Sequence, residues 1–168
     1  MSLLTKAILP LGLIASSFGA ASFADEADKG MYVTVGMGSG NIGDATGTAP
    51  GGNPTNNQIG SGTNSEFGFG YDFGNDVRTE LTYSSLSGDV TNVGGTALPD
   101  GSAAVTVKTV SLNVFKDFSN DSSFTPYVGA GISNATADFT AVGAVPAGSG
   151  SSTGYNLKLG ASYAMTDK

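Results

Sequence analysis

The sequence predicts an all-β protein, an antiparallel up-and-down transmembrane β-barrel in which six strands are visible. Three observations lead to this prediction. Several segments alternate apolar and polar residues with the period of two that is typical of strands. No segment after the N-terminus is long and apolar enough to cross a membrane as a helix. Finally, short and long connections alternate along the chain, as they do in membrane barrels.

Residues 66–86 carry the clearest pattern, that of a β-hairpin. On the first strand the apolar face is aromatic and uncharged, and consists of Phe67, Phe69, Tyr71 and Phe73. The tripeptide Gly-Asn-Asp at 74–76 supplies turn chemistry, after which Leu81 and Tyr83 continue the apolar face. The opposite face holds glycine, small polar residues and charges of both signs. It is too polar for a soluble core but suits the filled interior of a small membrane barrel.

The remaining strands are predicted, in chain order, at residues 31–38, 105–115, 124–132 and 154–163. Each alternates, and glycine is frequent on the inner face, where side chains crowd one another in a narrow barrel. The phase of 105–115 is the least defined. If Val110, Leu112 and Val114 face outward, apolar side chains at Val105, Val107 and Phe115 face inward.

The connections predict which end of the barrel is variable. Residues 39–65, 87–102 and 135–153 have the Gly, Ser, Thr, Asn and Pro content of long mobile loops, although 137–142 can extend the strands beyond the membrane. The connections at 74–76 and 116–123 are short. With an exported N-terminus, we expect the short turns in the periplasm and the long loops outside.

The N-terminus is typical of a cleaved export signal. Lys6 supplies the positive charge, residues 7–15 form a short apolar stretch, and Ser22-Phe23-Ala24 is a small-x-small cleavage site. We therefore expect residues 1–24 to be a signal peptide and residues 25–168 to be the barrel domain. The alternative is a buried or membrane-anchoring helix.

Composition excludes several kinds of chemistry. The chain contains no cysteine and no histidine, so it has no disulfides, no thiol nucleophile and no histidine base. The formal charge of −7 argues against a nucleic-acid partner. The acids at Asp100, Asp117 and Asp121 lack the spacing of a calcium loop and are interpreted as solvated. We expect no catalytic residues, no metal site and no cofactor.

Two groups of residues define the predicted barrel surfaces. Opposite charges on the inner face are expected to pair and plug the lumen, rather than form a gate or a catalytic carboxylate pair: Glu66, Arg78, Glu80 and Lys158. The predicted lipid-facing residues are Val33, Val35, Phe67, Phe69, Tyr71, Phe73, Leu81, Tyr83, Val128, Ile132, Leu157 and Leu159.

Five pieces of the sequence resemble a known family. They are Gly-Met-Tyr-Val at 30–33, Arg-Thr-Glu-Leu-Thr-Tyr at 78–83, Asn-Val-Phe-Lys-Asp-Phe at 113–118, Thr-Pro-Tyr-Val-Gly-Ala-Gly at 125–131 and Tyr-Asn-Leu-Lys-Leu-Gly-Ala-Ser-Tyr at 155–163. Their order and spacing resemble the eight-stranded outer-membrane β-barrel domain of OmpA-like, opacity-type and surface-antigen proteins of Gram-negative bacteria. The family's last two strands have no counterpart here, so we expect residues 25–168 to be a C-terminally truncated barrel.

The resemblance implies a location and a function. It implies an exported protein of the Gram-negative outer membrane that contacts outer-membrane lipid and, during biogenesis, the barrel-assembly machinery and periplasmic chaperones. It implies a non-enzymatic surface antigen or envelope structural protein, with adhesion through long external loops whose partner the sequence does not identify. Two alternatives are a small porin-like channel for solutes and a secreted, soluble calycin-like barrel that binds a small apolar ligand.

Overall fold

The computed structural model describes residues 16–24, 29–43, 45–48, 54–93, 95–140 and 147–163, and in this part of the chain the regular structure is entirely β-strand. The strands are β1 Ser16–Ala24, β2 Gly30–Asn41, β3 Ala45–Thr48, β4 Pro54–Ile59, β5 Ser61–Asp72, β6 Val77–Val93, β7 Thr96–Ala97, β8 Ala104–Asp117, β9 Phe124–Phe139 and β10 Gly148–Tyr163. Within these ranges there is no helix long and apolar enough to cross a membrane.

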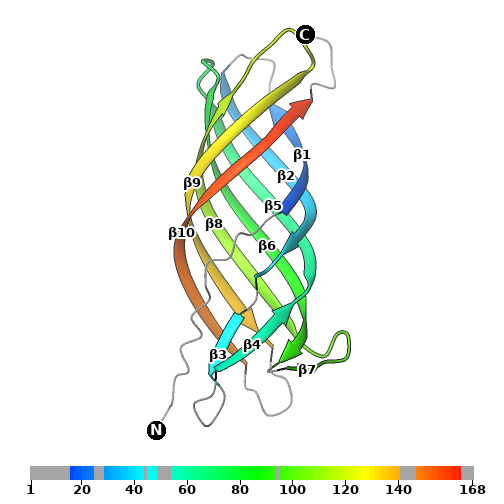
Figure 1. The fold of residues 1–168 in the computed structure, drawn as a ribbon. Coiled ribbons are helices and arrows are strands. Elements are labelled where there is room, and N and C mark those ends of the chain that lie inside the picture. Colours follow the sequence, from blue (N-terminus) through cyan, green and yellow to red (C-terminus); the bar gives the residue numbers. More distant parts are fainter. Residues whose placement is uncertain are drawn as a thin grey trace.

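The main sheet is antiparallel throughout and follows the order β1-β2-β5-β6-β8-β9-β10. It curls around one axis as an up-and-down barrel (Figure 1). The sheet is not closed, since none of the described pairings joins β1 to β10. The predicted fold class is confirmed, and the six predicted strands correspond to β2, β5, β6, β8, β9 and β10.

The three predicted long loops are shorter than expected, which corrects the sequence analysis. Between 39 and 65, β2 continues to Asn41 and β3 and β4 form a hairpin, with β4 also pairing with β6. Between 87 and 102, β6 continues to Val93 and pairs with β7. Between 135 and 153, β9 continues to Phe139 and pairs with β10 from Gly148. Neighbouring backbones hold these polar residues in strands, which their composition alone does not indicate.

Strand β1 lies within the predicted signal peptide. It pairs antiparallel with β2 from Ser16 opposite Gly40 to Ala24 opposite Tyr32. The alternative interpretation, a helix over the apolar stretch at residues 7–15, falls outside the described residues and is not tested. Residues 1–15 and 25–28 lie outside the described part, and cleavage after Ala24 stays a prediction.

The short turns at one end of the barrel are held together by Asp76, whose backbone is left-handed at φ 62°. Its carboxylate accepts hydrogen bonds from the Ser119 hydroxyl at 2.6 Å and from Lys116 Nζ at 3.0 Å. The hydrogen bond from Ser119, followed by the hydrogen bond and positive charge of Lys116, lowers the pKa of Asp76 below its usual range. The β5–β6 turn is thereby fixed to the start of the β8–β9 turn.

Large inward side chains lie over glycines on the neighbouring strand. Tyr32 is paired in register with Gly70, and a Cβ at Gly70 would overlap the Tyr32 ring. The same relation holds for Phe115 over Gly129 and for Tyr127 over Gly160. Glycine at these three positions therefore has a packing reason, because each of them leaves the space that one ring occupies.

We predict that Gly129→Ala lowers the free energy of unfolding by about 1–3 kcal/mol, because the added methyl forces the Phe115 ring out of a filled interior. Urea unfolding in detergent micelles measures the change. The matched control is Gly148→Ala, where an added Cβ meets no atom within 4 Å and stability should stay constant. Equal stability of the two variants would contradict this account of the glycines.

Candidate membrane-facing band and barrel interior

The predicted lipid-facing residues lie on the outer face of the barrel. Eleven of them have exposed side chains, namely Val35, Phe67, Phe69, Tyr71, Phe73, Leu81, Tyr83, Val128, Ile132, Leu157 and Leu159. The twelfth, Val33, is half-buried on the same face of β2. On β10 this exposure reaches 82% at Leu157, because no further strand covers that edge. Contact of these residues with lipid stays a prediction.

The structure resolves the phase of β8. Val110, Leu112 and Val114 are exposed, whereas Val105, Val107 and Phe115 are buried in the interior. The inner face of β8 is therefore apolar at both ends, at Val105 and Val107 and at Phe115, and its outer face is the one that carries Val110, Leu112 and Val114.

On β5, β6 and β8 the apolar outer face ends at a sharp boundary, whereas on β2 it continues to Met37. In one row of paired residues, Val35, Phe67, Tyr83 and Val110 all face outward. Two residues further from the short turns, the outward row on β5, β6 and β8 is Ser65, Ser85 and Lys108. On β8 the outward residues from Val110 to Val114 are apolar, and Phe118 is apolar too, whereas Lys116 between them is bonded to Asp76 of the neighbouring turn. The stretch covers about nine residues, the length of a membrane-crossing strand. We call this region the apolar band.

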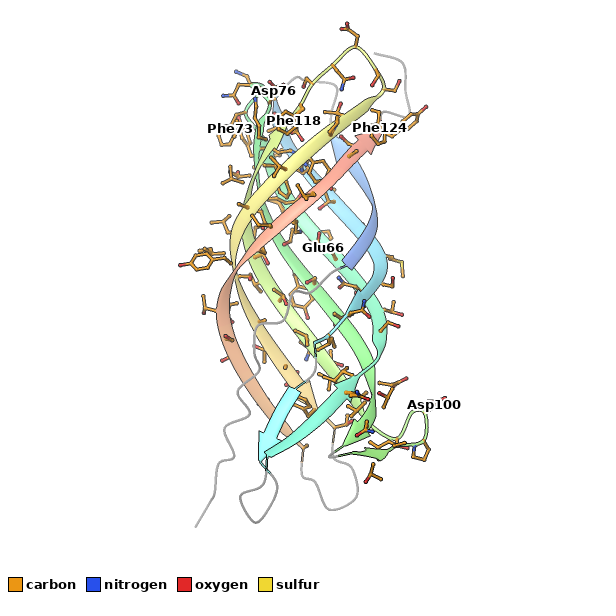
Figure 2. The ribbon with its side chains drawn as sticks, in the orientation of Figure 1. Glu66, Phe73, Asp76, Asp100, Phe118 and Phe124 are labelled. Atoms are coloured by element: carbon orange, nitrogen blue, oxygen red, sulfur yellow. The ribbon has the colours of Figure 1, made fainter. Side chains whose placement is uncertain are left out.

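Aromatic side chains mark the short-turn edge of the apolar band. Phe73, Phe118 and Phe124 lie at this end of the barrel and are about half exposed (Figure 2). Tyr71 packs edge-to-face on Phe73, with 5.1 Å between the ring centroids. Such girdles are typical of the membrane–water interface, so this edge fits the level of the lipid headgroups.

Beyond the apolar band the polarity of the two faces is exchanged. The inner face there is apolar, and its buried residues, which we call the cap core, are Ile42, Leu86, Val90, Ala103, Val105, Val107 and Ala137. The outer face is polar and includes Lys108, whose Nζ lies 3.0 Å from Asp138 Oδ2. The strands at this end therefore have the pattern of a protein folded in water, with a dry interior and a polar exterior.

Arg78 organises the interior of the apolar band at the short-turn end. Its Nε donates to Asp117 Oδ2 at 3.0 Å and its Nη1 donates to the Tyr32 hydroxyl at 3.2 Å. Its guanidinium carbon lies 4.2 Å from the centroid of the Phe115 ring and 4.8 Å from that of Tyr127. The charge is thus held between a carboxylate and aromatic faces, which suits a buried arginine.

The structure divides the four predicted plug residues into two pairs. Arg78 Nη1 lies 3.8 Å from Glu80 Oε2. Lys158 Nζ lies 3.0 Å from both Glu66 oxygens, so β10 reaches across the lumen to β5. All four side chains are at most 24% exposed, and the Lys158–Glu66 pair spans the lumen.

Sequence reasoning missed three partners of Arg78: Tyr32, Asp117 and Tyr127. Asp117 was interpreted as a solvated acid, which is wrong, because its side chain is only 14% exposed and is bound to Arg78. Tyr32 and Tyr127 stood on the inner face of their predicted strands, which was a usable signal. No local pattern, however, indicated which inward residue they would contact.

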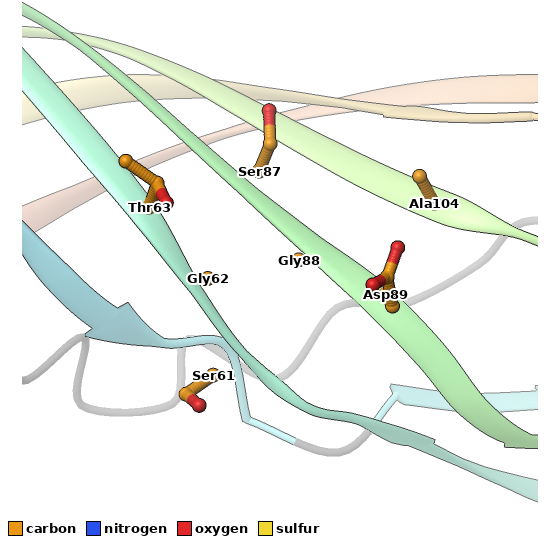
Figure 3. Close-up of a pocket in the computed structure, with 7 residues that line it drawn as sticks. All are labelled: Ser61, Gly62, Thr63, Ser87, Gly88, Asp89 and Ala104. Atoms are coloured by element: carbon orange, nitrogen blue, oxygen red, sulfur yellow. The ribbon is translucent and has the colours of Figure 1, made fainter. Parts of the chain in front are cut away.

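The described residues offer few other candidates for a metal, ligand or catalytic site. In the part of the chain that the structure describes, no three His, Cys, Asp or Glu residues are grouped so that they could hold a metal ion. A hollow of about 380 Å³ lies past the apolar band on β5, β6 and β8 (Figure 3). Its lining is small and mostly polar, and consists of Ser61, Gly62, Thr63, Ser87, Gly88, Asp89 and Ala104. This lining contains one carboxylate, that of Asp89, and the hydroxyls of Ser61, Thr63 and Ser87.

A family model for the outer membrane protein beta-barrel domain matches residues 11–168. The chain belongs to this family. No curated protein and no solved structure matches the chain. The protein is therefore an outer-membrane β-barrel protein. Its apolar side chains lie on the outer face of the sheet, as expected for a barrel surrounded by lipid. The finer resemblance to OmpA-like and opacity-type proteins stays a prediction. The soluble calycin-like alternative required the aromatic face to turn inward, but this face points outward.

We predict that lysine is tolerated on the outer face of β8 outside the apolar band but not within it. Leu112→Lys should reduce the stability of the inserted protein by about 2–4 kcal/mol, because it places a charge in the hydrocarbon layer. Thr106→Lys, on the same face of the same strand beyond the band, should insert normally. Heat-dependent gel mobility after folding into vesicles measures insertion. Equal loss in both variants would show that the band boundary is misplaced.

Proposed function

We propose that the protein is a non-conducting, non-enzymatic outer-membrane barrel that displays its long-loop end at the cell surface. The observation that carries the proposal is the exchange of polarity along the strands. The outer face is apolar near the short turns and polar beyond, whereas the inner face is polar near the short turns and apolar beyond. One half is therefore suited to lipid and the other to water.

The filled interior supports a structural or adhesive role over a channel. The Arg78 cluster occupies the short-turn end of the lumen, and the cap core occupies the opposite end. A solute would have to displace ion-paired and aromatic side chains at one end and buried valines and leucine at the other. The absence of histidine from the sequence also removes the usual base for a serine nucleophile.

The biogenesis that we propose follows the family. A signal peptide at residues 1–24 directs export and is cleaved after Ala24, and chaperones and the assembly machinery deliver the barrel to the Gram-negative outer membrane. The β3–β4 hairpin and β7, beside Asp100, extend from the far end (Figures 1 and 2). These segments are the surface through which we propose contact with other cells or with host molecules.

Epitope tags test the orientation. We predict that a tag inserted at Asp100 binds antibody on intact cells, whereas a tag at Asp121, in the β8–β9 turn, binds only after the cells are permeabilised. Asp100 lies at the opposite end of the barrel from Phe118 and Phe124, and Asp121 lies between these two phenylalanines in the sequence (Figure 2). The reverse pattern would contradict the orientation. Labelling of neither site until lysis would contradict surface display.

Conductance in planar bilayers tests whether the lumen is blocked. We predict that the wild-type protein gives no stepwise current, because both ends of the lumen are filled. Heat-dependent gel mobility of the same vesicles shows that the protein is inserted. A combined Arg78→Ala, Leu86→Ala and Val107→Ala variant, which thins both obstructions, should conduct more than the wild type. A steady open channel in the wild type would instead support the porin-like alternative.

A further inference from the structure

The two edges of the main sheet differ in what covers them. At one edge, β1 pairs with β2 over residues 16–24. At the other edge, β10 pairs with β9 on one side, and none of the described pairings covers its second side. This part of β10 lies at the apolar band, where Leu157 and Leu159 are 82% and 81% exposed. Backbone N–H and C=O groups without a partner are costly in hydrocarbon, so the open edge of β10 requires another strand.

Strand direction decides which strand can cover that edge. β10 ends at Tyr163, opposite the first residue of β9, so it runs toward the short-turn end of the barrel (Figure 1). β1 ends at Ala24, opposite Tyr32 near the start of β2, and β2 starts opposite Asp72 beside the β5–β6 turn. β1 and β10 therefore run in the same direction, whereas β2 and β10 run in opposite directions. Because up-and-down membrane barrels are antiparallel throughout, β10 can close on β2 but not on β1.

The ion pair between Lys158 and Glu66 indicates the register of such a closure. Lys158 Nζ lies 3.0 Å from Glu66 Oε2, so β10 and β5 already approach each other across the lumen. Glu66 is paired in register with Gly36 of β2. Since glycine has no side chain, a β10 strand beside β2 with Lys158 opposite Gly36 keeps a free path to Glu66. In this register Leu159 is opposite Val35, and both are exposed on the outer face, as lipid contact requires.

We infer that β1 is a temporary edge strand that keeps the barrel open until residues 1–24 are removed. While residues 16–24 pair with β2, the edge that β10 needs is occupied. Their removal changes the main sheet from seven strands to six, an even number whose two edges, β2 and β10, are antiparallel. Pairing these edges satisfies both sets of backbone groups. The inference rests on the proposed cleavage after Ala24, and it makes closure follow export, because an export signal is removed after translocation.

Disulfide cross-linking tests the inference, since the chain contains no cysteine of its own. The full chain with Val35→Cys and Leu159→Cys is produced in a Gram-negative host, once with the proposed cleavage site intact and once with Ala24→Leu, which retains residues 1–24. Each form is unfolded in urea, refolded in detergent micelles and oxidised. The cleaved form should cross-link within one chain. The uncleaved form should cross-link at least about tenfold less, because a disulfide requires Cα atoms within about 7 Å.

Two further cysteine pairs are matched controls. Tyr155→Cys with Val35→Cys uses an exposed residue of β10 that lies about 13 Å along the strand from Leu159, and it should not cross-link in the cleaved form. Ala21→Cys with Val35→Cys joins residues that are opposite in β1 and β2, and it should cross-link in the uncleaved form. If the cysteine variants do not fold, hydrogen exchange replaces them. Every second amide of residues 155–163 should exchange slowly in the cleaved wild type and fast in Ala24→Leu.

The outcomes separate closure from cleavage. Equal cross-linking with and without residues 1–24 would overturn the inference, as would a cleaved form in which Val35→Cys reacts with none of Leu157→Cys, Leu159→Cys and Ala161→Cys. Cross-links between two chains would also overturn it and assign the open edges to a second copy. The N-terminal mass of each form reports cleavage independently. A wild type that retains residues 1–24 would contradict the proposed cleavage alone, and a protease site inserted after Ala24 would then supply the cleaved form for the same comparison.

Discussion

The structure depends on one constraint. A strand that passes from lipid into water must keep its backbone hydrogen bonds in both solvents, and the polarity of its inner and outer side chains must differ between them. In hydrocarbon, each N–H and C=O needs a partner on a neighbouring strand. The antiparallel pairing of β2, β5, β6, β8, β9 and β10 supplies these partners over the apolar band, except along the unpaired edge of β10. In water the same pairing continues, but a dry core is then needed to hold the strands together, and the cap core supplies it.

The width of the lumen follows from side-chain packing. Tyr32, Phe115 and Tyr127 each lie over a glycine of the next strand, which lets the strands approach and curve tightly. The rings then form the walls against which the Arg78 guanidinium lies. Lys158 on β10 reaches Glu66 on β5, so the two sides of the sheet are joined across the lumen even where the edges are not paired. The same aromatic rings therefore account for the curvature of the sheet, occupy part of the lumen and contact the Arg78 charge.

The interior charges are more consistent with a permanent filling than with a reaction centre. Arg78 is held by a carboxylate, a phenol hydroxyl and two aromatic faces at once, and such a network is costly to disrupt. The surface that is free to make contacts lies instead at the long-loop end, where the hairpin β3–β4 and β7 extend the strands of the barrel. A display role for that end and a stabilising role for the lumen fit this division.

Alternation alone predicts the six strands, the hairpin at 66–86 and, except for residues 105–115, the inner and outer faces, because it is local and visible without any knowledge of partners. It also placed Glu66, Arg78, Glu80 and Lys158 on the inner face. Only the tertiary structure decided how far the strands continue into 87–93 and 133–139, since Ser- and Gly-rich segments become strands only when a neighbour pairs with them. The same holds for Asp117 and Tyr32 as partners of Arg78, and for the choice between the two phases of β8. Register, curvature and the position of the solvent boundary join residues far apart in the chain, and no local pattern contains them.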